Sequence, residues 1–218
     1  MGLAFLVSRV VITGDYEYWF LAWNVFLAFI PWLISAWLLA KKTLGASKWI
    51  WLICWLLFLP NTFYLATDVI HLAYIQSSAT ENAATFLSDP DVSIVLLDSV
   101  IVLLGAWVGW FLGVASLRHI HKTLSTRFSR VKTAVIIGLI TLASSYAIYL
   151  GRILRLNSWE LATNPLSLVD EIVGSISDQR AFGITMLFFV MISIVYWSVD
   201  ILLFSGERPK AQRSTAKK

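Results

Sequence analysis

Five charged side chains in this sequence combine the types needed for acid–base chemistry on an anionic group. Asp68 and His71 are three residues apart, so on a helix they share one face and can act together as acid and base. Arg152 and Arg155 have the same spacing, and a guanidinium binds a phosphate or a carboxylate through two parallel hydrogen bonds. We predict that the two arginines bind a ligand, and that three residues form a catalytic group: Asp68, His71 and Asp98.

Side chains that can hydrogen-bond a ligand accompany these charges. Asn61 and Tyr64 fall on the helix face that also carries the first carboxylate. Pro60, just before them, should bend the helix and free a backbone carbonyl. Further along the chain, Tyr149 shares a helix face with Arg152. The predicted ligand-binding residues therefore also include Asn61, Tyr64, Tyr149, Asn157 and Trp159.

Each of these residues also has a purely structural interpretation. A carboxylate and an arginine inside a helix bundle can be an ion pair that sets the helix register. Asparagines between membrane helices often serve as interhelical hydrogen-bonding groups. His71 with two carboxylates lacks the second nitrogen ligand of common zinc sites, and no Gly-x-Ser-x-Gly, P-loop or HExxH motif is present. The sequence therefore predicts no metal and no cofactor.

The composition limits which class of protein can carry these residues. Of 218 residues, 58% are hydrophobic and only 14% are charged, and the mean hydropathy is +0.75. A soluble domain is roughly 25% charged, so this chain cannot cover a globular surface with polar groups. Cys54 is the single cysteine, so no internal disulfide can form. A soluble enzyme, a disordered chain and a disulfide scaffold are excluded.

Five continuous apolar stretches reach the length of about 20 residues that crosses a bilayer as a helix. They lack the alternation of a membrane β-barrel. We predict an all-α polytopic membrane protein with a single transmembrane domain over 1–206 and a basic cytoplasmic tail over 207–218. The predicted spans are 19–40, 49–70, 92–114, 133–154 and 181–204.

Lysine and arginine positions predict the orientation of these spans. Segment 41–48 holds three, segment 115–132 holds five, and the chain after Gly206 holds five, whereas the alternate segments hold four together. Basic loops stay in the cytoplasm, so we expect the N terminus outside and the C terminus inside. Topology and anionic lipid then account for the net charge of +4. Membrane lipid is the expected partner, and nucleic acid is not.

Three polar side chains are expected at the cytoplasmic end. His119 and His121 belong to the basic segment after the third span, where we expect them to be solvated. Asp200, near the end of the last span, should reach the head groups or pair with the basic tail.

Small residues predict where two spans pack together. They recur every four residues in both the third and the fourth span, and such stripes let helix backbones approach closely. We expect these two spans to pack through Gly105, Gly109 and Gly113 on one side and Ala143, Ala147 and Gly151 on the other.

An external amphipathic helix is predicted over 165–176. Asn164 and Pro165 form a start signal, with asparagine as N-cap and proline in the first turn. Apolar residues then recur at helical spacing opposite Asp170 and Glu171, which is typical of a helix lying on a membrane surface. These residues are Leu166, Val169, Ile172, Val173 and Ile176.

Three segments resemble a known family. They read NVFLAFIP over 24–31, FLPNTFYLATDVIHL over 58–72 and SSYAIYLGRILRLNSWELATNPLSL over 144–168. Together they resemble the bacterial membrane family filed as domain of unknown function 1361, which implies a multi-pass protein of the bacterial inner membrane and supplies no activity. The family pattern falls on Pro60, Asn61, Tyr64, Thr67, Asp68, His71, Gly151, Arg152, Arg155, Asn157, Ser158 and Trp159.

Three functions remain open from the residues alone. The first is an outward-facing polar pocket that binds or processes an anionic or lipid-linked head group. The second is a non-enzymatic subunit of a larger membrane complex. Transport or a proton relay comes third, because the inner halves of the spans offer little polarity beyond Ser35, Cys54 and Asp200.

The orientation can be tested with reporter fusions. Fusions after Gly45, Phe128 and Gly206 should report a cytoplasmic position, and fusions near Ser78 and Ser175 an external one. A cytoplasmic signal at Ser78 would contradict the predicted alternation of the spans.

Overall fold

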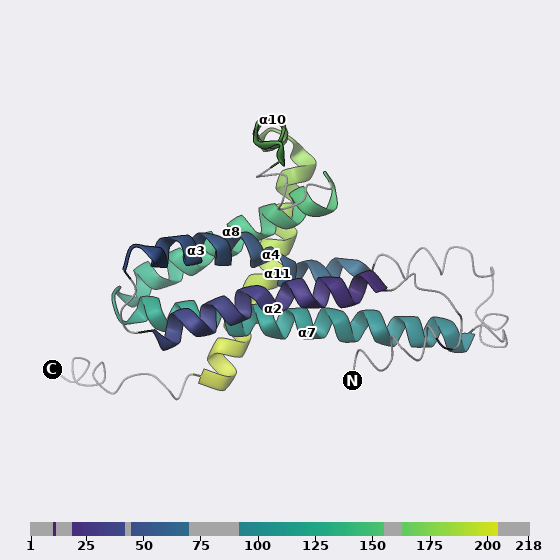
Figure 1. Cartoon of the computed structure of the whole chain (residues 1–218), viewed down its shortest axis with the longest axis horizontal. Coiled ribbons are helices and arrows are strands. Elements are labelled where there is room, and N and C mark those ends of the chain that lie inside the picture. The colour runs from purple at the N-terminus through teal and green to yellow at the C-terminus, as the bar shows by residue number, and fades with distance from the viewer. Residues whose placement is uncertain (1–10, 12–18, 42–44, 70–91, 155–162, 205–218) are drawn as a thin grey trace.

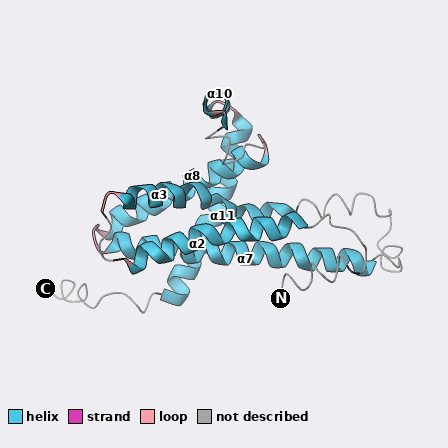
Figure 2. Cartoon of the chain, in the orientation of Figure 1, coloured by secondary structure: helices cyan, strands magenta, loops and turns pink. Residues whose placement is uncertain are grey.

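The described part of the chain is entirely helical (Figures 1 and 2). The structure is a computed structural model, and it describes residues 11, 19–41, 45–69, 92–154 and 163–204. Five of its helical stretches are long and apolar enough to cross a membrane, as predicted. The elements are α2 (Trp19–Ala40), α3 (Ser47–Phe58), α4 (Pro60–Tyr64), the 3-10 helix η1 (Leu65–Val69), α7 (Val92–Ser125), α8 (Arg130–Arg152), α10 (Pro165–Ile176) and α11 (Gln179–Phe204).

The second span is divided at Pro60 into α3, α4 and η1. Proline has no N–H to donate to the carbonyl four residues before it, that of Leu56. Two side chains bond other carbonyls around the break: Asn61 Nδ2 donates to the Phe58 carbonyl at 3.2 Å, and Thr62 Oγ1 donates to the Leu59 carbonyl at 2.7 Å. The span is thus interrupted beside Pro60, and the bend there stays a prediction. Asn61 has a structural role at this break.

The third span is longer than predicted. We expected it to end at residue 114, but α7 continues to Ser125 and has 34 residues. Its length is about 51 Å, against about 30 Å for the hydrocarbon core of a bilayer. Most of segment 115–132, predicted as a loop, is therefore helix. Hydropathy marks where apolar side chains stop, and the helical backbone continues beyond that point.

A buried chain of hydrogen bonds ties the first three spans together. The indole nitrogen of Trp55 in α3 donates to Ser116 Oγ in α7 at 2.7 Å. Ser116 Oγ in turn donates to the carbonyl oxygen of Pro31 in α2 at 3.1 Å. Such bonds are directional, so they set how the three helices are rotated against one another.

The glycine stripe of α7 packs against the second span, and not against α8 as predicted. A Cβ added at Gly109 would overlap the carbonyl oxygen of Thr62 and lie 2.5 Å from Leu65 Cδ1. At Gly113 it would lie 2.5 Å from Thr62 Oγ1 and 2.6 Å from the ring of Phe63. Only glycine leaves room for α4 to approach α7 this closely.

The small-residue stripe of α8 does not form the predicted contact either. Ala143 is exposed and Ala147 is half-buried. The fourth span instead buries a face that carries hydroxyl-bearing and large side chains. Because these side chains occupy space between the helices, α8 contacts its neighbours through side chains and its backbone stays further away. This face consists of Thr133, Ile137, Thr141, Ser144, Ser145, Ile148 and Tyr149.

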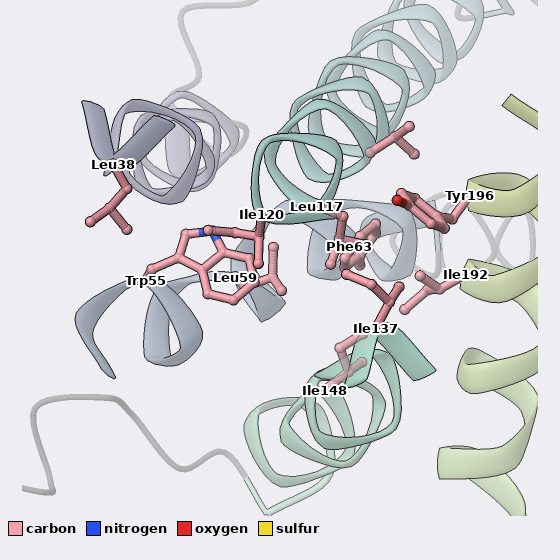
Figure 3. Close-up of a cluster of buried hydrophobic side chains, with 11 residues drawn as sticks. Leu38, Trp55, Leu59, Phe63, Leu117, Ile120, Ile137, Ile148, Ile192 and Tyr196 are labelled. Atoms are coloured by element: carbon pink, nitrogen blue, oxygen red, sulfur yellow. The ribbon is translucent and has the colours of Figure 1, made fainter. Parts of the chain in front are cut away.

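Apolar side chains join α8 and α11 to the first three spans (Figure 3). Ile137 and Ile148 of α8 and Ile192 of α11 are each fully buried in one cluster with Phe63 and Leu117. In Figure 1, α2, α3 and α7 run along one direction, whereas α11 crosses them steeply. The ends of α2 and α7 and the starts of α3 and α8 lie at the same end of the bundle.

Helix α10 has the bounds predicted for the amphipathic helix. Pro165 occupies its first turn and Asn164 the N-cap position, where the asparagine side chain makes no capping hydrogen bond. The hydroxyl of Tyr146 in α8 donates to the Ile172 carbonyl at 3.1 Å and lies 2.6 Å from Ser175 Oγ. Helix α10 is thus attached to the end of α8.

The contact between α7 and the second span can be tested by adding one methyl group. Gly109→Ala should lower the free energy of unfolding by roughly 1 to 3 kcal/mol, because the methyl group overlaps backbone atoms. Gly138→Ala is the control, since a Cβ there meets nothing within 4 Å. Thermal unfolding in detergent measures both, and equal stability of the two variants would contradict the close contact.

Candidate functional site

A carboxylate and a guanidinium from two different spans meet at one end of the bundle. Arg152 Nη1, at the end of α8, lies 3.4 Å from Asp68 Oδ1 in η1. The Asp68 side chain is 1% exposed and the Arg152 side chain 20%. An isolated buried charge in an apolar bundle costs several kcal/mol, so each group requires the other. The predicted contact between Arg152 and Asp68 or Asp98 is confirmed for Asp68.

Uncharged groups hold the guanidinium in place. Nη2 of Arg152 donates to the backbone carbonyl of Thr67 at 2.7 Å, and Nη1 lies 3.3 Å from the hydroxyl of Tyr64. The guanidinium carbon also lies 5.2 Å from the centre of the Tyr64 ring, within the range of a cation–π interaction. Tyr64 was predicted as a site residue, whereas the Thr67 carbonyl is backbone and no side-chain pattern indicates it.

The first span contributes an amide to the same group. Asn24 Nδ2 donates to Asp68 Oδ2 at 3.2 Å, so both carboxylate oxygens have a partner on another helix. Asn24 was not among the predicted site residues, because helical depth places it deeper in the membrane than Asp68, and only the structure shows the hydrogen bond between them. We name the four side chains Asn24, Tyr64, Asp68 and Arg152 the outer cluster, after the orientation predicted from the sequence.

Two predicted ligand-binding residues, Asn61 and Tyr149, form hydrogen bonds outside the outer cluster. Asn61 donates to the Phe58 carbonyl, as described above. The hydroxyl of Tyr149, which is 2% exposed, donates to Asp178 Oδ2 at 2.8 Å. The backbone N–H of Arg180 and the hydroxyl of Tyr149 hold the pKa of the Asp178 carboxyl below its ordinary value. This contact joins the end of α8 to the start of α11.

Of the remaining predicted site residues, the structure describes Asp98. Asp98 is 3% exposed on α7, on the face that carries the glycines. Within the described ranges, no three His, Cys, Asp or Glu side chains gather into a metal-binding group. Four predicted site residues lie outside the described residues: His71, Arg155, Asn157 and Trp159.

The histidines at the other end of the bundle differ from the prediction. His119 and His121 are half-buried in α7 and not solvated in a loop. His119 Nδ1 lies 3.0 Å from Ser35 Oγ, and His121 Nδ1 lies 2.6 Å from the hydroxyl of Tyr196 in α11. The helix simply continues past the last apolar turn and carries both rings into the bundle.

Asp200 also has a partner that we did not predict. It forms an ion pair with Arg118 of α7, where we expected the head groups or the basic tail. Polar side chains therefore also gather at the end of the bundle that we predicted to face the cytoplasm, which weakens the sequence argument against transport. We name Arg118, His121, Tyr196 and Asp200 the inner cluster. Arg118 was predicted to lie in the loop 115–132, and for this reason the sequence analysis did not consider it as a partner of Asp200.

Removing the buried carboxylate should destabilise the fold. Asp68→Ala leaves the guanidinium of Arg152 without its counter-charge and the amide of Asn24 without its acceptor, so the free energy of unfolding should fall by about 3 kcal/mol. Asp170→Ala is the control, because that carboxylate is exposed on α10. Thermal unfolding of both variants measures the difference, and equal values would contradict the outer cluster.

Comparison with known proteins identifies a family for this chain. Comparison with curated proteins and with solved structures found no match. Residues 23–195, from the first span to the last, match a family described as protein of unknown function (DUF1361). That range includes every member of the outer cluster. The chain is a multi-pass membrane protein, and it belongs to the DUF1361 family.

Proposed function

We propose that this chain is an integral protein of the bacterial plasma (inner) membrane whose outer cluster binds an anionic or lipid-linked head group. The N terminus lies outside and the C terminus in the cytoplasm. The observation that carries the proposal is the asymmetry of the Asp68–Arg152 pair, in which the carboxylate is 1% exposed and the guanidinium 20%. The positive charge is therefore the more accessible of the two, and the negative charge is enclosed.

The hydrogen bonds of Arg152 support this function. Its contact with Asp68 is 3.4 Å, whereas charge-assisted N–H···O bonds are about 2.7 to 2.9 Å. Its shortest bond is to an uncharged carbonyl. The guanidinium is therefore held in position by neutral groups, and its charge is only partly compensated. A phosphate or carboxylate with two free oxygens is the ligand that such a group recognises best.

The position of the site favours a ligand that arrives through the lipid. Arg152 is the last residue of a membrane-spanning helix, at the level where head groups lie. Arg155, three residues further along the sequence, would bind the same ligand together with Asn157 and Trp159. If the ligand is processed as well as bound, Asp68, His71 and Asp98 are the acid and base groups available.

Helix α10 favours a second candidate function, that of a non-enzymatic subunit in a larger membrane complex. Four apolar side chains on one of its faces are at least 54% exposed, at the spacing of a helix–helix contact. A complex that survives mild detergent and is lost when these residues become serine would favour that function. The residues are Leu166, Val169, Val173 and Ile176.

Head-group binding can be measured with a short-chain lipid. Dihexanoyl phosphatidylglycerol should raise the unfolding temperature of the purified protein more than dihexanoyl phosphatidylcholine does, because a ligand that binds the native state stabilises it. Arg152→Lys should remain folded and bind the anionic lipid about tenfold more weakly, since lysine keeps the charge and loses the planar fork.

Arg180→Lys is the matched control for this experiment. Arg180 is an exposed arginine near the outer end of α11, and its conversion should leave the response to the lipid unchanged. Equal binding of the two lipids by the wild type, or equal responses of the Arg152 and Arg180 variants, would overturn the proposed function.

A further inference from the structure

Two ion pairs lie at opposite ends of the bundle. Arg152, in the outer cluster, ends α8, whereas Arg118, in the inner cluster, lies about two turns before the end of α7 that leads into α8. The outer pair joins η1 to α8, and the inner pair joins α7 to α11. Both therefore connect the first three spans to the last two.

The first three spans form a tightly connected group. Within it, α4 approaches the glycines of α7 at backbone distance, and Ser116 links α2, α3 and α7 through hydrogen bonds. The last two spans form a second group, in which Tyr149 of α8 bonds Asp178 beside α11 and Tyr146 bonds α10. Each group is held by directional bonds or by close backbone contact.

The boundary between the groups is of a different kind. Its central part consists of aliphatic and aromatic side chains such as Phe63, Leu117, Ile148 and Ile192 (Figure 3). Apolar contact is non-directional, so it tolerates a small rotation of one group against the other. Across this boundary, the described residues form charged and hydrogen-bonded contacts at its two ends, in the outer and inner clusters.

Ion pairs at the two ends of this boundary contribute little net stability to the contact between the two groups of helices. Burying two charges costs about as much as their attraction returns, and well-packed apolar side chains of similar size often stabilise a protein as much or more. A pair near the membrane surface can also separate, because water then solvates each charge. The side chains of Arg118 and Asp200 are each 15% exposed, so the protein fully encloses neither charge.

We propose that α8 and α11 move as one rigid unit against the first three spans, and that the two ion pairs are latches that open one at a time. Separation of Asp68 from Arg152 opens the outer end, and separation of Arg118 from Asp200 opens the inner end. This motion needs no ligand, so it goes beyond the proposed function. An anion that binds Arg152 would compete with Asp68 and favour the outward-open state.

Spin-label distances across the boundary test this motion in the full-length protein. Two cysteine pairs in a Cys54→Ser background report on the two ends, Trp49 with Leu202 for the inner end and Leu96 with Phe182 for the outer. All four native side chains are exposed, so labels should not disturb the core. Pulsed electron paramagnetic resonance in lipid nanodiscs gives each distance distribution.

The double variant R118M/D200L should lengthen the inner distance by about 5 Å, on the order of one helical turn, and leave the outer distance unchanged. D200N, which keeps the side-chain shape, should lengthen the inner distance to a smaller extent. This variant replaces the double variant in the test if the double variant does not fold. The charge-swapped control R118D/D200R should restore the wild-type distribution.

Two results would overturn the proposal. Wild-type distributions at both ends in R118M/D200L and D200N would show that the inner pair is a fixed connection in a rigid bundle. Broadening at both ends together would show a general loss of packing and not a latch. Neither result depends on a ligand, so the proposed head-group site would stand or fail separately.

Discussion

The close contact between the glycine face of α7 and the broken second span determines where the outer cluster can form. With no side chain at Gly109 and Gly113, the backbone of α4 lies directly against α7. Pro60 interrupts the backbone hydrogen bonds of the helix just before this contact, and the hydroxyl of Thr62 donates to the carbonyl of Leu59. The chain then continues as η1 along α7, which brings Asp68 to Asn24 and Arg152. A bulkier α7 would displace Asp68 from both partners.

The ion pairs of the two clusters differ in how exposed their side chains are. In the outer cluster the carboxylate is enclosed and the guanidinium is partly accessible, whereas in the inner pair both side chains are equally exposed. Separation of the outer pair leaves an enclosed carboxylate without its counter-charge, so it should cost more than separation of the inner pair, in which neither charge is fully enclosed. An anion that replaces the carboxylate at Arg152 would lower that cost.

The last two spans combine rigid attachment with an apolar boundary. Tyrosines of α8 bond to α10 and to Asp178, so movement of α8 would carry α10 and the start of α11 with it. Arg152 belongs to this unit and Asp68 to the other. Binding at the outer cluster is therefore coupled by geometry to the position of α8 and α11. A head-group site on such a boundary can serve recognition, processing or transfer.

The sequence by itself determined the helical spans, the amphipathic helix and the need for a partner at Asp68. Continuous apolar segments of this length can satisfy their backbone in lipid only as helices, and a buried charge must be compensated. Helical periodicity indicates which residues share a face but not which neighbour that face meets. The tertiary structure decided that α4, and not α8, fills the glycine face, and that Arg118 pairs with Asp200. Both contacts join residues far apart in the chain, where shape and packing of whole helices select the partner.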